Sequence, residues 1–215
     1  MKALSLTPLY ATLLATGEKR YETRCWHPRE LREETVAIHA SAFMPASERG
    51  RQTAPHFREA LARHGYGPMQ SRVSGGNPVP RGAILALCEV VGFWRCGDTV
   101  FSPRAQRLLG RDDAEAAFGD FRPRDEKGRT RWAWAVAAVR PLFRPVPCKG
   151  RLGLWDVPPE VAREVLSLVR DDAPNLSRAD ALEQSIADTL SDEQLVMMPQ
   201  LRRTRGGRNR KRKAA

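Results

Sequence analysis

The stretch GEKRYETR, residues Gly17 to Arg24, decides how the rest of this chain is interpreted. It directly follows an apolar helical pattern, and if it is extended we expect the heads of Lys19, Glu22 and Arg24 to share one face. A carboxylate held between two cations stays ionised, so such a trio can grip a phosphate or a polar base edge, or move a proton. The alternative is a solvated charged strand, because most surface ion pairs do little.

The segments around this stretch predict a small mixed fold. Residues 2–6 alternate as a strand does, and Thr7 with Pro8 is typical of an N-cap followed by proline at the first helical position. The spacing of the leucines then predicts a helix over residues 8–16, which Gly17 ends in the left-handed conformation. Apolar, β-rich runs at 36–41 and 82–94 predict two further strands.

In this order, the segments resemble the ASCH domain family, which belongs with the PUA-like RNA-binding domains. The resemblance rests on these segments: Lys2–Leu6, Gly17–Lys19, Tyr21–Trp26, Ala37–Ser41, Gly82–Ile84, Ala117–Phe121, Arg131–Trp134 and Pro147–Trp155. It implies an α+β fold, a PUA-like small β-barrel of about five to six strands with flanking helices. It also implies a cleft between barrel and helices that accommodates a nucleobase or nucleotide.

The pattern of the chain divides it into three parts. Residues 1–157 carry the ASCH-like domain, with insertions near 43–80, where we expect a helix over 54–64, and near 122–130, where we expect a hairpin tip. Residues 158–199 then predict a helical extension. Its 177–190 helix has an apolar stripe, Leu182, Ile186 and Leu190, which packs in the core or binds a protein partner. Residues 200–215 predict a disordered basic tail.

The tail contains most of the positive charge of the chain. The net charge is +11, and eight basic residues without an acid lie between 201 and 215, which leaves +3 elsewhere. Free lysines and arginines release counterions when they meet phosphates, so the tail predicts salt-sensitive, sequence-independent affinity; the alternative is a solubility tail. The expected phosphate contacts are Arg202, Arg203, Arg205, Arg208, Arg210, Lys211, Arg212 and Lys213.

Composition predicts a cytoplasmic protein without a membrane segment. Apolar residues make up 41% of the chain, but no apolar run approaches the roughly 18 residues of a membrane span, and Thr7 and Pro8 interrupt any signal-like start. The four cysteines are scattered, so we expect reduced thiols, no metal site and no cofactor. The neighbouring Lys149 predicts a lowered pKa for the Cys148 thiol.

Several aromatic side chains could serve either the core or a ligand. The two tryptophans of the 132–134 strand are expected in the core, whereas Trp26 and Trp155 are candidates for stacking on an unpaired base or for core packing. His39 alternates with Ser41 on a strand that the resemblance places beside the cleft. It is either a neutral, hydrogen-bonded core histidine or a catalytic one.

These observations predict a nucleic-acid-binding protein, with single-stranded RNA preferred to DNA because of the resemblance. The expected contacts are Lys19, Glu22, Arg24, Trp26, His39, Ser41, Lys149, Arg151 and Trp155. The alternative is a hydrolase, a ribonuclease or a modified-nucleoside amidohydrolase, with Lys19 and Glu22 as catalytic residues. The family branch that deacylates modified cytidine has a lysine at the position of Lys19 but a threonine where this chain has Glu22.

Overall fold

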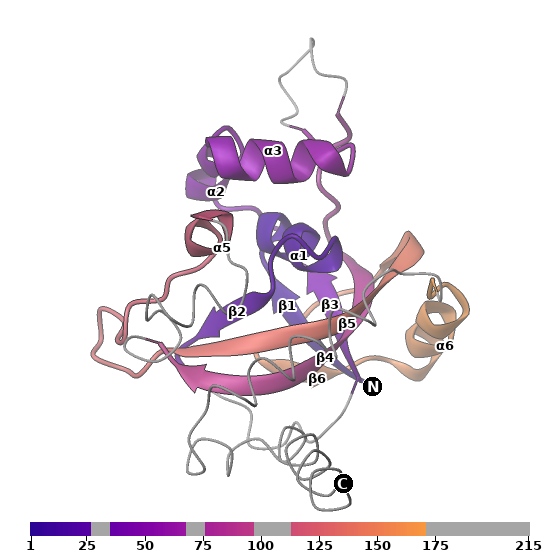
Figure 1. Ribbon diagram of the computed structural model, residues 1–215. Coiled ribbons are helices and arrows are strands. Elements are labelled where there is room, and N and C mark those ends of the chain that lie inside the picture. The colour runs from indigo at the N-terminus through magenta and orange to yellow at the C-terminus, as the bar shows by residue number, and fades with distance from the viewer. Residues whose placement is uncertain (27–34, 68–75, 97–112, 171–215) are drawn as a thin grey trace, which may run out of the picture.

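A six-stranded sheet forms the centre of the computed structural model, which describes residues 1–26, 35–67, 76–96 and 113–170 (Figure 1). The strand order is β2-β5-β4-β3-β1-β6, in which β1 and β3 are parallel and the other neighbours antiparallel. The strands are β1 (Lys2–Leu6), β2 (Tyr21–Arg24), β3 (Thr35–Ala40), β4 (Ala83–Arg95), β5 (Trp132–Pro147) and β6 (Leu154–Asp156). With its helices, this sheet confirms the predicted α+β class and strand number.

The sheet curls because its two long strands are irregular. β4 and β5 pair antiparallel over most of their length, and their register shifts at three places: between Ile84 and Ala86, Leu87 and Glu89, and Val90 and Gly92. A bulge bends the strand that carries it and increases the local twist. The ladder stays open, with β2 and β6 as its two edges, so the predicted PUA-like small barrel takes the form of a curled half-barrel.

The helices α1 (Pro8–Ala15), α2 (Ala46–Arg51), α3 (Pro55–Arg63) and α5 (Asp113–Ala117) lie on one side of the sheet in Figure 1, and α6 (Pro159–Ser167) packs against β5. The predicted helices over 8–16 and 54–64 are confirmed, and Gly17 has the expected left-handed φ of 77°. Thr7 occupies the predicted N-cap position, but its side chain does not cap the helix. The predicted N-cap position and the proline at the start of the helix are confirmed.

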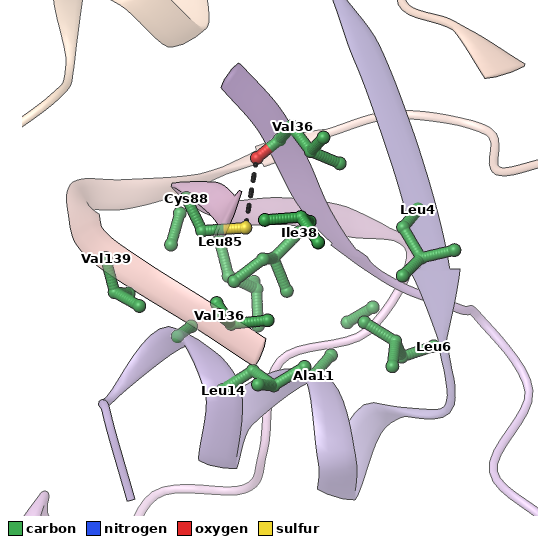
Figure 2. Packing of buried hydrophobic residues seen from close by; sticks show 14 of the residues in the cluster. Leu4, Leu6, Ala11, Leu14, Val36, Ile38, Leu85, Cys88, Val136 and Val139 are labelled. Atoms are coloured by element: carbon green, nitrogen blue, oxygen red, sulfur yellow. Dashed lines mark hydrogen bonds between the residues drawn. The ribbon is translucent and has the colours of Figure 1, made fainter. Parts of the chain in front are cut away.

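Three clusters form the core of the described residues: α1 lies between two of them, and the third packs α6 against the sheet. Toward the sheet, Ala11 and Leu14 of α1 join Leu6, Ile38 and further strand residues in one cluster (Figure 2). On the other side, Leu9 and Leu13 pack with residues of α3 and with Phe118. Because both of its faces are covered, α1 is buried along its whole length, which makes it the rigid element from which the GEKRYETR stretch departs.

The structure describes only part of the first predicted insertion and of the predicted helical extension. An antiparallel bridge between Arg124 and Thr130 confirms the predicted hairpin tip, and α6 occupies the start of the predicted helical extension. The predicted 177–190 helix and the basic tail lie outside the described residues. Within the described ranges, no helix is long and apolar enough to cross a membrane.

The start of β2 is fixed by a carboxylate from α5. Glu115 is 1% exposed, and its two oxygens accept hydrogen bonds from the backbone N–H of Arg20 (2.9 Å) and of Tyr21 (3.1 Å). Burial raises the pKa of Glu115, and the nearby charge of Lys19 opposes this shift. The Glu115 carboxyl group and the Lys19 side chain therefore lie close enough to interact inside the protein.

We predict that Glu115→Ala lowers the free energy of unfolding by about 3 kcal/mol, because it leaves two N–H donors without an acceptor and removes one of the two carboxylates near Lys19. The measurement is urea denaturation at pH 7. Glu126→Ala is the control, since Glu126 is exposed on the hairpin, and a change within about 0.5 kcal/mol is expected there. Equal stabilities of the two variants would contradict this role of Glu115.

Candidate functional site

Lys19 lies in the bend between Gly17 and β2 and is buried, with 1% of its surface exposed. Its Nζ donates hydrogen bonds to the carbonyl oxygens of Tyr21 and Phe118, the latter at 2.7 Å, and lies 3.7 Å from Glu22 Oε2. In an extended strand, residues three apart would point to opposite faces. The bend, and not the expected extended conformation, therefore brings the ammonium and the carboxylate together.

Glu22 and Arg24 complete the predicted trio. Both belong to β2 and share a face, and Arg24 Nε lies 2.9 Å from Glu22 Oε1. The side chains of Glu22 and Arg24 are 10% and 28% exposed. The three heads are thus assembled as a partly buried ion-pair cluster, and the solvated charged strand that was the alternative is not observed.

A hydrogen bond from Arg24 joins two distant strands of the sheet. Arg24 Nη2 donates to the carbonyl oxygen of Ser5 on β1, at 2.9 Å. Three strands separate β2 from β1 in the sheet order, so the contact is only made because the sheet curls. The Arg24 side chain therefore links the ion-pair cluster on β2 to β1, two strands that are not paired by backbone hydrogen bonds.

The hydroxyl of Ser5 continues this connection to a buried histidine. His39 Nδ1 lies 3.1 Å from Ser5 Oγ, and His39 Nε2 lies 2.9 Å from the carbonyl oxygen of Cys148. A carbonyl only accepts, so Nε2 carries a proton, and burial lowers the pKa of His39 and keeps the ring neutral. Nδ1 must then accept from Ser5, whose oxygen in turn accepts from Trp155 Nε1 at 3.0 Å.

Of the two alternatives for His39, the structure therefore favours the neutral, hydrogen-bonded core histidine over the catalytic one. It is 1% exposed, both ring nitrogens have partners, and its ring packs edge-on against Trp155 with centroids 5.5 Å apart. Trp155 itself is 5% exposed. In this structure both rings hold the loop after β5 in place and lie beneath the surface.

The loop after β5, residues 148–153, is called here the basic loop. Gly150 lies so close to the sheet that an added Cβ would be 2.7 Å from the Ser5 hydroxyl and nearer still to the His39 ring. Only glycine allows this approach. The flanking side chains of Lys149 and Arg151 are exposed, so the backbone of the loop is fixed on the sheet while its cations face solvent.

The other predicted contacts lie elsewhere. Trp26 is half-buried and packs edge-on against Trp134 with ring centroids 4.8 Å apart, and its carbonyl oxygen accepts from Trp134 Nε1. Ser41 donates its hydroxyl to the carbonyl oxygen of Phe43 at 2.8 Å. The cations expected from the tail lie outside the described residues.

A further acidic side chain, which the sequence did not point to, is buried near the cluster. Glu48 of α2 is 7% exposed, accepts a hydrogen bond from the Thr7 side chain, and has no hydrogen-bond partner for Oε2 among the described residues. Burial raises its pKa, and the charge of Glu22 acts in the same direction. The hydroxyl of Tyr10 accepts from Arg51 beside it.

Neither Ser5 nor Glu48 has a strong signal in the sequence. Ser5 is the polar member of an alternating strand, a position that is usually solvated, and its partners are 34 and 150 residues away. Glu48 lies in an insertion where no helix was predicted over residues 46–51. Proline at position 45 followed by an acid three residues later is the one local pattern that indicates a helix start there.

The cysteines correct one prediction. All four are free, but burial raises the pKa of Cys148, and Glu160 adds to that shift. The predicted lowering by Lys149 was therefore wrong, because desolvation exceeds the effect of the neighbouring cations. Among the residues that the structure describes, no group of histidine, cysteine, aspartate or glutamate side chains is arranged to hold a metal ion.

Comparison with known proteins gives structural neighbours only. No protein-family model matches this chain, and neither does any curated protein. The crystal structure of ASCH from Zymomonas mobilis is similar at 15% identity and a TM-score of 0.43, covering 79% of this chain and 95% of that one. Two point-mutant structures of the same protein give the same identity and TM-score. These neighbours carry the family name that the sequence resemblance indicated.

We predict that His39→Gln flattens the dependence of stability on pH. The folded pKa of His39 lies below its unfolded value of about 6.5, so below that pH the unfolded state binds more protons and the free energy of unfolding falls. One histidine contributes a slope of at most about 1.4 kcal/mol per pH unit. The measurement is urea denaturation between pH 5 and 7.5, compared with the wild-type protein.

His56→Gln is the matched control, because His56 is exposed on α3. This variant should keep the slope of the wild-type protein. A His39→Gln variant with an unchanged slope would show that His39 is not held neutral.

Proposed function

We propose that this protein binds nucleic acid, with single-stranded RNA as its preferred partner, through the basic loop and the ion-pair cluster beside it. The observation that carries the proposal is the fixed backbone of the loop, with Lys149 and Arg151 exposed on either side of the buried contact made by Gly150. Cations on an already ordered backbone lose little conformational entropy when they meet phosphates. The preference for RNA rests on the ASCH resemblance alone.

In this proposal Arg24 and Glu22 recognise a nucleotide next to the loop. Arg24 is oriented by Glu22 and by the Ser5 carbonyl oxygen, and its side chain stays 28% exposed. A planar guanidinium in a fixed orientation can donate to a base edge or stack on a ring. Lys19 lies beneath the surface, and its Nζ, 3.7 Å from Glu22 Oε2, helps to hold the carboxylate in position. The buried rings of His39 and Trp155 support the loop.

The basic tail contributes long-range attraction. Its eight cations carry most of the net charge, so deletion of residues 202–215 should weaken binding to all sequences alike and flatten the salt dependence. Selectivity between oligonucleotides should survive the deletion, because it is assigned to the folded part. Equal salt slopes for the full and shortened chains would remove the tail from the proposal.

We predict that the double variant Lys149→Ala/Arg151→Ala binds a single-stranded oligoribonucleotide more weakly and with less salt dependence. Two lost phosphate contacts should reduce the slope of log K against log salt by about 1.4. Fluorescence anisotropy between 50 and 300 mM KCl measures both quantities. The charge-matched control is Arg58→Ala/Lys127→Ala, which removes two exposed cations from α3 and the hairpin. If both double variants behave alike, the basic loop is not the interface.

A hydrolase is the second candidate, and the carboxylate of Glu48 is the observation that favours it. One oxygen of this buried group lacks a partner among the described residues, and its pKa is raised, a state suited to proton transfer. In this candidate function Glu22 takes a proton from water, Glu48 gives a proton to the leaving group, and Lys19 stabilises developing negative charge. Mass spectrometry of single-stranded RNA and acylated nucleosides after incubation tests it. Product formation that is lost in Glu22→Gln would establish an enzyme, whereas unchanged substrates would leave binding alone.

A further inference from the structure

A pocket of about 430 Å³ is lined by residues from the end of α1, from the segment after α3 and from the later part of β5. Its volume is within the range of about 300 to 1,000 Å³ that is typical of small-molecule sites. Leu85, Val139 and Leu142 form part of its apolar wall. The β5 strand that lines the pocket leads into the basic loop, and Phe143 is six residues from Lys149, about 20 Å along an extended chain.

An exposed aromatic ring stands at the rim of this pocket. Phe143 is 65% exposed, and the guanidinium of Arg170 lies over its ring at 5.0 Å from the centroid. Both residues are held by backbone hydrogen bonds, from Phe143 N to the Leu168 carbonyl oxygen and from Arg170 N to the Pro141 carbonyl oxygen. The backbone of both residues is therefore fixed, and the ring and the cation stand together at the rim, as in sites where a planar ligand stacks.

Polar groups surround the apolar wall. Thr16 donates its hydroxyl to the Thr12 carbonyl oxygen, at 2.9 Å, so its oxygen remains able to accept. His64 is held by Glu18 at 2.8 Å. Burial raises the pKa of Tyr66, which keeps its hydroxyl protonated as a donor. Together with the ring of Phe143, the pocket offers one stacking face and several hydrogen-bonding groups toward an edge.

We infer that this pocket accepts one unpaired nucleobase of the bound strand, stacked on Phe143 with its polar edge toward Thr16, His64 and Tyr66. The inference rests on the proposed function and adds to it the place where a base is held. Arg170, which is exposed and whose guanidinium lies over that ring, can meet the phosphate of the same nucleotide. Trp26 and Trp155 were the stacking candidates in the sequence, but both pack against other buried rings, so Phe143 takes that role.

The test compares two fluorescent oligoribonucleotides of equal length, one with bases and one with a run of abasic residues, by anisotropy with the full chain. The wild-type protein should bind the base-bearing strand more tightly. Phe143→Ala should weaken that binding about tenfold, the order expected for loss of one stacking contact, without affecting the abasic strand. Phe143→Trp should retain the preference, and Leu166→Ala, which removes an exposed apolar side chain on α6, should leave both affinities unchanged.

The outcomes separate this inference from the proposed function. If Phe143→Ala binds both strands as the wild-type protein does, or weakens both equally, the pocket does not hold a base, and binding through the basic loop still stands. If the wild-type protein binds neither strand, the proposed function and the inference both fail. A preference for an apolar peptide over either strand would also overturn the assignment of a nucleobase.

Discussion

The buried ammonium of Lys19 is the constraint on which the site depends. A charge removed from water must be compensated by hydrogen bonds and opposite charge, and here the carbonyl oxygens of Tyr21 and Phe118 and the carboxylate of Glu22 surround it. Glu115 supports the same charge while it fixes the start of β2. These contacts tie the end of α1, the edge strand and the segment after α5 into one unit.

From this unit a chain of polar contacts extends across the curled sheet. Glu22 orients Arg24, Arg24 reaches the Ser5 carbonyl oxygen, and the Ser5 hydroxyl orients His39. His39 then holds the carbonyl oxygen of Cys148 at the start of the basic loop. Arg24 donates to the Ser5 carbonyl oxygen, the Ser5 hydroxyl donates to His39, and His39 donates to the Cys148 carbonyl oxygen, so the direction of these hydrogen bonds is defined. The charges most suited to meeting phosphate are consequently displayed on a backbone that the interior has fixed.

Much of the fold could be predicted from the sequence, because alternation, proline and glycine act locally. The strands at 2–6, 36–41 and 82–94, and the helix ended by Gly17, needed no knowledge of distant residues. The site was predicted less well. Ser5 contacts residues far away in the chain, one of which is Trp155. Trp155 is buried by contacts of this long-range kind, which the local sequence pattern does not indicate. Desolvation likewise reversed the expected pKa shift of Cys148.

The most direct test of the account is to map where RNA lies on the folded part of the protein. A 4-thiouridine oligoribonucleotide can be photocrosslinked to the full chain and the modified peptides identified by mass spectrometry. We expect crosslinks at the basic loop, residues 148–153, and around Phe143, and these should persist at 200 mM salt. Crosslinks confined to residues 202–215 and lost at that salt concentration would contradict the account, because binding would then belong to the tail alone.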